Sequence, residues 1–448
     1  MPSRTVLLAT FDWGWDGTET YDRKFQEGDV IQFPGQCADA RPRYGAGGWI
    51  HWPDHEPESL RLRQLLGDAQ EGASCISECL LVADRIAPGD DESWQREWHV
   101  LADCIAARAR SSLASGHLST ARYESLRALN YYRTSAAFLD PADSRTAELS
   151  ALARACARSF LELLAPRGER VRIPTQRGIL HGYLIRSPAA PRKSPAIVCV
   201  GESRDSKEDL LVRFQSHAIA RGFSLLAIDL SHPVDPLDAG VTHDHQEALQ
   251  SCVDYLILRD DIDGTKISIV GDGIGGTHAT RAAVYDRRLA AVVCDGGFWD
   301  DREYQYVAAT LADNFGWPLR SMPHKYVLAR QIQCPCLVVV GAHGYGSVEE
   351  FMALQQHCAE AGVAIDLKIY SDEETGSSHR QVDNPTVARQ YIFDWLKDRL
   401  DLKESDIHDR FTGRASRRAS SDKLAPRLDR LSPLHRLAPL AIASSRPR

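Results

Sequence analysis

The sequence predicts an α/β fold, with a mostly parallel eight-stranded sheet that follows an N-terminal helical cap domain. Residues 58–164 carry apolar side chains at i, i+3 and i+4, which is the helical period. From residue 195 onward, short apolar runs alternate with helical stretches. Strands that are apolar throughout and separated by helices are typical of βαβ units, in which helices cover both faces of a parallel sheet.

The chain divides into four parts by composition. Residues 1–57 form an irregular N-terminal segment rich in Gly, Pro, Trp and Asp, and residues 58–166 form the helical cap domain. Residues 167–400 hold the predicted sheet and its helices. Residues 401–448 are rich in Arg, Ser and Pro with few large apolar side chains, so we expect a disordered, basic tail.

The strands and helices of the core can be placed in order. ERVRIPT (169–175) and ILHGYLIR (179–186) predict an antiparallel pair. The further strands are predicted at 195–201, 223–230, 266–271, 290–296, 335–341 and 364–370, and the helices at 207–220, 241–258, 275–286, 347–361 and 385–399. Residues 302–333 are longer than an ordinary connection and carry aromatic side chains, which favours a lid over the site.

Charge and targeting signals limit the classes of function. The net charge of -8 and the pI of about 6.1 give no support for non-specific nucleic-acid binding. No signal peptide is evident, and no segment is apolar enough to span a bilayer. We therefore expect a cytoplasmic protein whose partner is a small-molecule substrate, with neither nucleic acid nor membrane as partner. A homodimer is left open.

No metal or cofactor is expected. The 11 cysteines are scattered without a C-x-x-C pair, and several lie inside apolar runs, which indicates buried reduced thiols. His243, Asp244 and His245 stand together, but they lack the further ligands of a metallohydrolase. A pair of histidines at the start of a helix is the simpler interpretation.

The stretch KISIVGDGIGG (266–276) has the glycine spacing of a nucleophile elbow. Such a turn between strand and helix needs small residues two before and two after the nucleophile, because larger side chains would clash. Gly271 and Gly275 stand at those two positions, and Gly276 lets the helix approach its strand. This register places Gly273 at the position of the nucleophile, where it supplies no side chain.

Two other interpretations of this stretch stay open. Sliding the register by one places Asp272 at the nucleophile position, but Ile274 then falls where a glycine is needed. The letters GDGIGG also partly match the G-x-G-x-x-G phosphate loop, although a glycine-rich turn alone is weak evidence for a dinucleotide site.

The remaining members of a catalytic triad are only partly present. His379 follows the last strand in a Gly- and Ser-rich loop, where a catalytic base is expected. Gly344 occupies the usual place of the acid after the 335–341 strand, so that acid is missing. Asp295, at the end of the 290–296 strand, is the alternative acid that could orient the histidine.

Several segments together resemble a known family. These are GHLSTARYESLRALNYYRTSAAFL (116–139), VGESRDSKED (200–209), the glycine elbow, DRRLAAVVCDGGFWD (286–300) and the SSH that ends at His379. Their order resembles the FrsA and 2,6-dihydroxypseudooxynicotine hydrolase group of α/β-hydrolases, which includes fungal polyketide-shortening hydrolases. The resemblance covers residues 90–400.

The resemblance implies an α/β-hydrolase core under an N-terminal helical cap, and small carbonyl-rich substrates that are cleaved at C–C or ester bonds. In such relatives a serine stands at the position of Gly273, an acid near Gly344 and the base at His379. Only the base carries over to this chain.

The expected chemistry is therefore acid–base catalysis without a covalent serine intermediate. The N–H of Ile274 and an N–H from the loop with Glu202, Ser203 and Arg204 are expected to stabilise an oxyanion. His379, oriented by Asp295, is the expected general base on a water or a carbon acid.

The alternative function is a catalytically inactive pseudo-hydrolase that serves as a binding or regulatory partner. Three further side chains have open roles. Asp272 either takes part in catalysis or holds the turn by hydrogen bonds. Tyr132 and Arg133 either face the ligand from the cap or pack within it.

Overall fold

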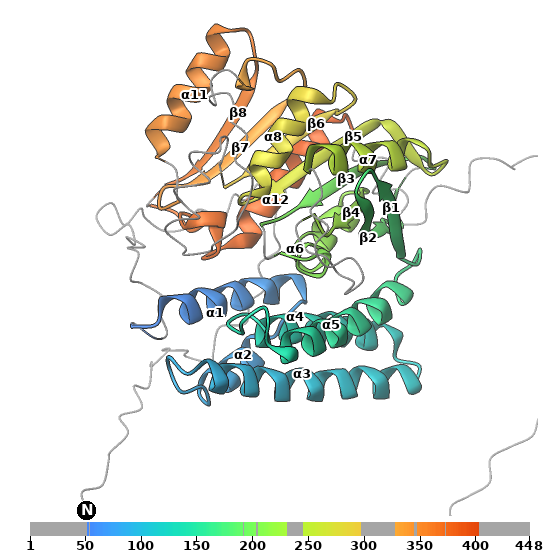
Figure 1. Ribbon diagram of the computed structural model, residues 1–448, viewed down its shortest axis with the longest axis vertical. Helices are drawn as coiled ribbons and strands as arrows, with labels where there is room; N and C mark the ends of the chain where they lie inside the picture. Colours follow the sequence, from blue (N-terminus) through green and yellow to red (C-terminus); the bar gives the residue numbers. More distant parts are fainter. Residues whose placement is uncertain are drawn as a thin grey trace, which may run out of the picture. The chain divides into compact units, whose positions relative to one another are not determined.

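The computed structural model of the chain describes residues 52, 54–190, 192–202, 205–230, 245–296, 328–344, 347–371 and 373–402 (Figure 1). All of them lie within one compact unit. The predictions made for the N-terminal segment before residue 52, for a lid at 302–327 and for the tail from residue 403 concern residues outside these ranges.

A block of helices precedes the sheet, and we refer to α1–α5 as the helical block. Its members are α1 (Glu56–Asp68), the 3-10 turn η1 (Ala69–Glu71), α2 (Ile76–Ala83), α3 (Asp91–Ala114), α4 (Leu118–Ser135) and α5 (Ser144–Glu162). The carboxylate of Asp90 starts α3 by accepting from the N–H groups of Glu92 and Ser93. Trp94, Trp98 and Tyr131 fill the centre of the block. The predicted helical pattern is confirmed here, while its assignment as a separate cap domain stays a prediction.

Eight strands form one sheet in the order β1-β2-β4-β3-β5-β6-β7-β8. They are β1 (Glu169–Thr175), β2 (Gly178–Arg186), β3 (Ser194–Val200), β4 (Ser224–Ile228), β5 (Ile262–Asp272), β6 (Ala291–Asp295), β7 (Cys336–Gly341) and β8 (Ile365–Tyr370). β2 pairs antiparallel with β1 and with β4, and every other pair is parallel. The mostly parallel eight-stranded sheet and its first hairpin are thus confirmed.

Helices pack on both faces of this sheet (Figure 1). The helices are α6 (Lys207–Ala220), α7 (His245–Ile257), α8 (Gly275–Tyr285), α11 (Val348–Glu360) and α12 (Pro385–Arg399). One face is buried with side chains of α7, α8 and α11, and the other with side chains of α6, α12 and the helical block. The predicted helix ranges are confirmed to within about two residues for all but α7, whose predicted first four residues lie outside the described ranges.

Polar contacts join the helical block to the helices that cover the sheet. Arg133 of α4 binds Asp209 of α6 with a 2.6 Å ion pair. Asp68 of α1 lies 3.3 Å from Arg389 of α12, and Glu71 of η1 lies 2.9 Å from His217 of α6.

The ten cysteines within the described residues form no disulfide, and six of them are buried. Burial raises the pKa values of Cys199, Cys252 and Cys336 well above the ordinary range, so these thiols are protonated and unreactive. Among the described helices, none combines the length and apolar character that a membrane span requires.

Candidate active site

The glycine-rich stretch forms the sharp turn that its spacing predicts. β5 ends at Asp272, Gly273 has φ +60°, and α8 starts at Gly275. The N–H of Gly273 donates to the carbonyl of Asp295 at 2.7 Å, and the N–H of Gly276 donates to the carbonyl of Gly273 at 2.9 Å. A left-handed φ at the tip is the strained geometry of a nucleophile elbow. The structure therefore supports the register with Gly273 at the tip.

Close packing explains the glycines on either side of the tip. A Cβ at Gly271 would lie 2.2 Å from the carbonyl oxygen of Gly275, and one at Gly275 would lie 2.4 Å from that of Val200. A Cβ at Gly276 would lie 2.6 Å from Sγ of Cys294. Backbone oxygens cannot move aside as a flexible side chain can, so larger residues would break the turn.

The space beside Gly273 is occupied by the side chain of Glu202. A Cβ at Gly273 would lie 2.2 Å from Oε1 of Glu202 and 2.7 Å from its Cγ. Glu202 follows β3 by two residues, in the loop to which the sequence assigned only an oxyanion role. The sequence predicts a nucleophile position without a side chain of its own, and the structure adds what lies beside it. Gly273 has no side chain of its own, yet a carboxylate from another loop fills its surroundings.

His379 lies at the same turn, where the sequence placed a base. It begins the 3-10 turn η3 (His379–Gln381) after β8, and its Nε2 lies 3.5 Å from Oε1 of Glu202. A Cβ at Gly296 would lie 3.1 Å from Cα of Gly273 and 3.3 Å from Cε1 of His379, so the imidazole is close to the turn. The side chains of His379 and Glu202 keep 16% and 27% of their surface exposed, which leaves both within reach of a ligand.

Asp295 does not orient His379 as the sequence analysis expected. Asp295 is paired in register with Asp272 on the neighbouring strand, and both side chains lie on the face that packs against α6 and α12. Its Oδ1 is buried without a hydrogen-bond partner among the described residues. It borders a cavity of about 10 Å³, together with Asp272, Gln381 and Arg389. Burial, with the charge of Asp272, raises the pKa of Asp295 to about 7.

Two arginines bind the carboxylates below the turn. Arg380 donates to Oε2 of Glu202 at 2.9 Å, to both oxygens of Asp272 at 2.7 Å and to Asp205 at 3.1 Å. Arg213 of α6 donates to Asp272 at 2.7 Å and to both oxygens of Asp205 at 2.7 Å. We call these five residues the arginine–carboxylate cluster.

The arginine contacts within this cluster indicate the role of Asp272. Burial alone would raise the pKa values of Asp205 and Asp272, but the two guanidinium groups hold both below the ordinary range. Both oxygens of Asp272 accept from arginine, and its side chain is 4% exposed. Asp272 therefore anchors the turn, which is the structural alternative, and the register that makes it a nucleophile has no support.

The sequence analysis missed Arg380, Arg213 and Asp205. Arg380 directly follows His379, and Asp205 lies three residues after Glu202. Their proximity in sequence to these two candidate residues is the signal that could have identified them. Arg380 has φ +55°, which is unfavourable for a residue with a side chain by roughly 1 kcal/mol. This backbone geometry turns Arg380 toward the carboxylates while its neighbour His379 stays at the tip.

Of the N–H groups predicted to form an oxyanion site, the structure describes those of Ile274 and Glu202. Within the described part of the chain, no oxygen accepts from the N–H of Ile274, which stands at the start of α8. A helix start carries partial positive charge, so this N–H is suited to an anionic oxygen. The N–H of Glu202 instead donates to Asp205 at 3.0 Å, and Ser203 and Arg204 lie outside the described residues.

The remaining predicted residues lie in the following places. Gly344 follows β7, and its N–H donates to the carbonyl of Gly341 at 2.9 Å, so no acid stands at that position. Tyr132 donates to Asp103 at 2.6 Å and packs within the helical block, as its packing alternative expected. Arg133 binds Asp209 and fastens the block to α6. His245 begins α7 next to the ring of His278, at a centroid separation of 4.0 Å.

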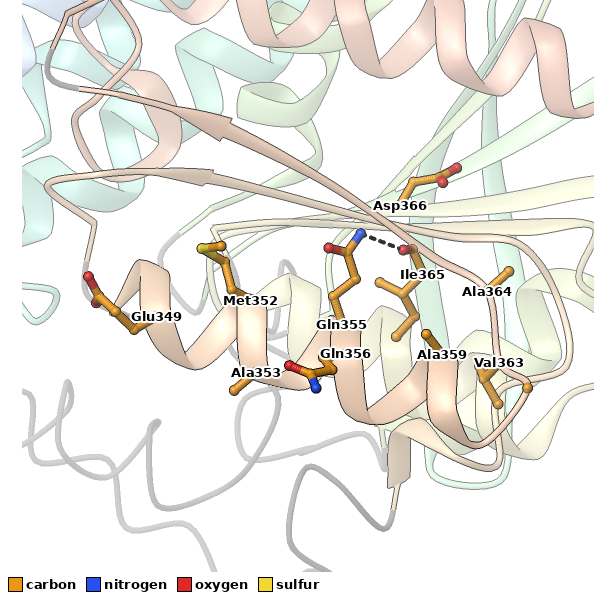
Figure 2. A pocket seen from close by; sticks show the side chains of 11 residues that line it. Glu349, Met352, Ala353, Gln355, Gln356, Ala359, Val363, Ala364, Ile365 and Asp366 are labelled. Atoms are coloured by element: carbon orange, nitrogen blue, oxygen red, sulfur yellow. Dashed lines mark hydrogen bonds between the residues drawn. The ribbon is translucent and has the colours of Figure 1, made fainter.

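The large surface groove lies away from this site. It encloses about 900 Å³ between α11 and the first residues of β8, where Gln355 donates to the carbonyl of Ile365 at 3.0 Å (Figure 2). Ligands of parallel sheets bind beyond the carboxyl ends of the strands. Gly273, Glu202 and His379 follow such ends, whereas the groove borders the beginning of a strand.

The sequence is similar to those of fungal hydrolases. It is 27% identical over 293 residues to the α/β hydrolase ucsC of Acremonium sp., covering 60% of this chain and 59% of that protein. It is 29% identical over 249 residues to 20-hydroxy-prefusarin hydrolase FUS2 of Gibberella moniliformis, covering 52% and 59%. The matches thus span about three fifths of these relatives' length. No protein-family model matches the chain.

Two solved structures resemble the fold over most of their length. The 2,6-dihydroxy-pseudo-oxynicotine hydrolase aligns with a TM-score of 0.62 and 19% identity, over 75% of this chain and 95% of that one. Wild-type AbyA5 aligns with a TM-score of 0.54 and 16% identity, over 80% and 98%. The strand order, the elbow at Gly273 and these matches agree, and we conclude that the chain has an α/β-hydrolase fold and is similar in sequence to fungal α/β hydrolases.

Proposed function

We propose that the protein acts on a small carbonyl-containing metabolite, polyketide-like or ester-like, by acid–base and oxyanion chemistry without a serine nucleophile. The observation that carries this proposal is the position of His379 against the tip of an elbow that has no hydroxyl group. A base remains where an acyl-enzyme cannot form, so the base acts on the substrate or on a water.

The remaining parts of the site agree with this chemistry. The N–H of Ile274 at the start of α8 stabilises negative charge that develops on a carbonyl oxygen. His379 moves the proton, and it remains partly exposed to a ligand. Hydrolysis, C–C cleavage, cyclisation and decarboxylation all pass through such an oxyanion or enolate.

The relatives' names support a small-molecule substrate. FUS2 is named for 20-hydroxy-prefusarin, and the solved relative for 2,6-dihydroxy-pseudo-oxynicotine. Both names describe hydrolases of small organic molecules. We extend that substrate class, and no particular substrate, to this chain.

One observation favours a second function, that of a pseudo-hydrolase which binds a ligand or a partner without turnover. Glu202, held by Arg380, occupies the place of the nucleophile side chain. A site that has lost its nucleophile and has been closed by another side chain is expected of a protein kept for binding.

Turnover and its dependence on His379 separate the two functions. We expect the purified protein to hydrolyse or rearrange members of an aryl-ester, acyl-ester and β-keto-ester panel, and His379→Ala to lower kcat/KM by about 100-fold or more. The control is His117→Ala, which removes an exposed histidine at the start of α4. Turnover that persists in His379→Ala would overturn the proposal. A wild-type protein without turnover that retains a metabolite on purification, seen by native mass spectrometry, would establish the second function.

A further inference from the structure

We infer that Glu202 is the proton acceptor of this site and that the substrate is a carbon acid, a β-keto ester or other 1,3-dicarbonyl compound, deprotonated at the carbon between its carbonyl groups. This inference rests on the proposed function and names its reaction, with Glu202 in place of His379 as the group that takes the proton from carbon and His379 as the group that delivers a proton to oxygen. Its starting point is the carboxylate oxygen Oε1 of Glu202, which lies where the nucleophile's side chain would otherwise stand.

The orientation of the carboxylate suits a base. Oε2 accepts from Arg380 at 2.9 Å, so this oxygen is engaged, while Oε1 faces Nε2 of His379 at 3.5 Å. The N–H of Glu202 donates to Asp205, whose carboxylate is itself bound by Arg213, and this fixes the loop. A base must be held rigidly and must keep a lone pair for the proton. Arg380 holds Glu202 through Oε2, and among the described residues Oε1 accepts no hydrogen bond.

The arginine contacts of the cluster are shared unevenly among its carboxylates. Three carboxylates, those of Glu202, Asp205 and Asp272, meet two guanidinium groups, those of Arg213 and Arg380. Both oxygens of Asp272 and both oxygens of Asp205 accept from arginine, whereas Glu202 accepts from arginine through Oε2 alone. Glu202 is thus the carboxylate of the cluster that arginine engages least.

The position of the Glu202 carboxylate disfavours a nucleophilic role for water. A water that attacks a carbonyl carbon bound at the Ile274 N–H would approach from the tip of the turn, where Glu202 already stands. The carbon next to that carbonyl, in contrast, is placed beside the carboxylate. The geometry thus presents a base to a C–H bond more readily than a nucleophile to a carbonyl.

The proposed reaction is a keto–enol conversion. The C–H bond breaks, its proton passes to Oε1 of Glu202, and its electron pair forms the C=C bond while the carbonyl pair moves to oxygen. The N–H of Ile274 stabilises this enolate oxygen, and Nε2–H of His379 protonates it. The proton on Glu202 then moves to His379 across their contact, which restores both groups. Among the described residues, the hydrogen bonds of Arg380 go to Glu202 and the two aspartates, and we assign it as a positioning residue.

Exchange of the substrate C–H for deuterium tests this inference independently of ester hydrolysis. The wild-type protein is incubated in D2O with a set of 2-alkyl β-keto esters, and loss of the C2–H signal and release of acid are followed together by NMR. We expect catalysed exchange, a loss of about 100-fold or more in Glu202→Gln, and partial recovery in Glu202→Asp, which keeps a carboxylate. Glu360→Gln, an exposed position on α11, is the matched control.

Each outcome decides the inference. Ester hydrolysis that depends on His379 without exchange overturns the inference and leaves the proposed function in place. Absence of both reactions overturns both. Exchange that is equal in wild-type and Glu202→Gln removes Glu202 as the base. Circular dichroism confirms that each variant is folded, and if Glu202→Gln does not fold, equal exchange in Glu202→Asp and wild-type overturns the inference instead.

Discussion

Oε1 of Glu202 and Nε2 of His379 lie 3.5 Å apart at the tip of a glycine elbow, although the two residues belong to loops that follow different strands. The histidine lies where the sequence predicts a base, and the carboxylate occupies the space that a side chain at Gly273 would need. The site is thus a carboxylate–imidazole pair at an elbow of the α/β-hydrolase fold. Four predictions test this arrangement and its supports.

A serine nucleophile can be restored only when Glu202 is removed. The Cβ of Gly273→Ser would lie 2.2 Å from Oε1 of Glu202, so we expect the single variant to lose roughly 1–3 kcal/mol of stability and to stay unreactive. Gly273→Ser with Glu202→Ala should react with a fluorophosphonate probe, detected by intact mass spectrometry, because His379 is already at the tip. Adding His379→Ala should abolish labelling. Equal labelling of the single and double variants would show that Glu202 does not block the position.

Arg380 is predicted to be essential for folding stability. Arg380→Ala leaves Asp272 with one arginine contact and Glu202 with none, in a largely buried cluster. Breaking one side of a buried ion pair costs about 3–5 kcal/mol, and we expect a loss of this size in the free energy of unfolding by urea. Arg145→Ala, at a more exposed pair with Glu92, is the control and should change the free energy of unfolding far less. Similar losses for the two variants would contradict the cluster's role.

The buried carboxyl of Asp295 is predicted to make the stability of the folded state depend on pH. Its pKa in the folded state is about 7, whereas in the unfolded chain it is near 3.9, so the folded state holds the proton that the unfolded state releases. The stability from this group is complete below about pH 4 and is lost as pH rises to about 7. Asp295→Asn has no carboxyl group to ionise in this pH range. We expect the difference in Tm, variant minus wild type, to increase from pH 5 to pH 8.

Differential scanning fluorimetry measures this change, with Asp260→Asn at an exposed position as the control. A Tm difference for Asp295→Asn that stays constant over this pH range would show that the buried carboxyl does not titrate near pH 7.

Arg133 is predicted to hold the helical block to the sheet domain. Its guanidinium binds the buried carboxylate of Asp209 on α6, with a 2.6 Å contact. Arg133→Ala leaves that carboxylate without this partner, and we expect about 3 kcal/mol of destabilisation and faster hydrogen exchange in α4 and α6. Arg96→Ala, at an exposed pair with Glu97, is the control. Unchanged exchange in α4 would mean that other contacts fasten the block.

The sequence predicted most of the secondary structure because each signal is local. Strands buried on both faces, such as β3 and β7, are continuous apolar runs, and the helices between them end at Gly, Pro or capping residues. The glycine spacing around Gly273 also predicted the elbow, since a Cβ at each glycine would clash within the turn or with an adjacent strand. The position of His379 followed from the order of the strands.

The partners of the site could not be predicted in this way. The sequence paired His379 with Asp295, because both follow strands that end at the same edge of the sheet. Side-chain direction in a strand alternates from residue to residue, and only the folded register places Asp295 on the face toward α6 and α12.

Alone, the amino-acid sequence determined the α/β fold, the elbow with a glycine at its tip and the retained histidine, because these depend on local pattern and chain order. The tertiary structure decided what occupies that tip. Glu202 reaches Gly273 because β3 and β5 are neighbours in the sheet, and Arg380 of η3, which follows β8, holds it there with a 2.9 Å hydrogen bond. Contacts between loops that are distant in sequence depend on strand order and register, which no local pattern encodes.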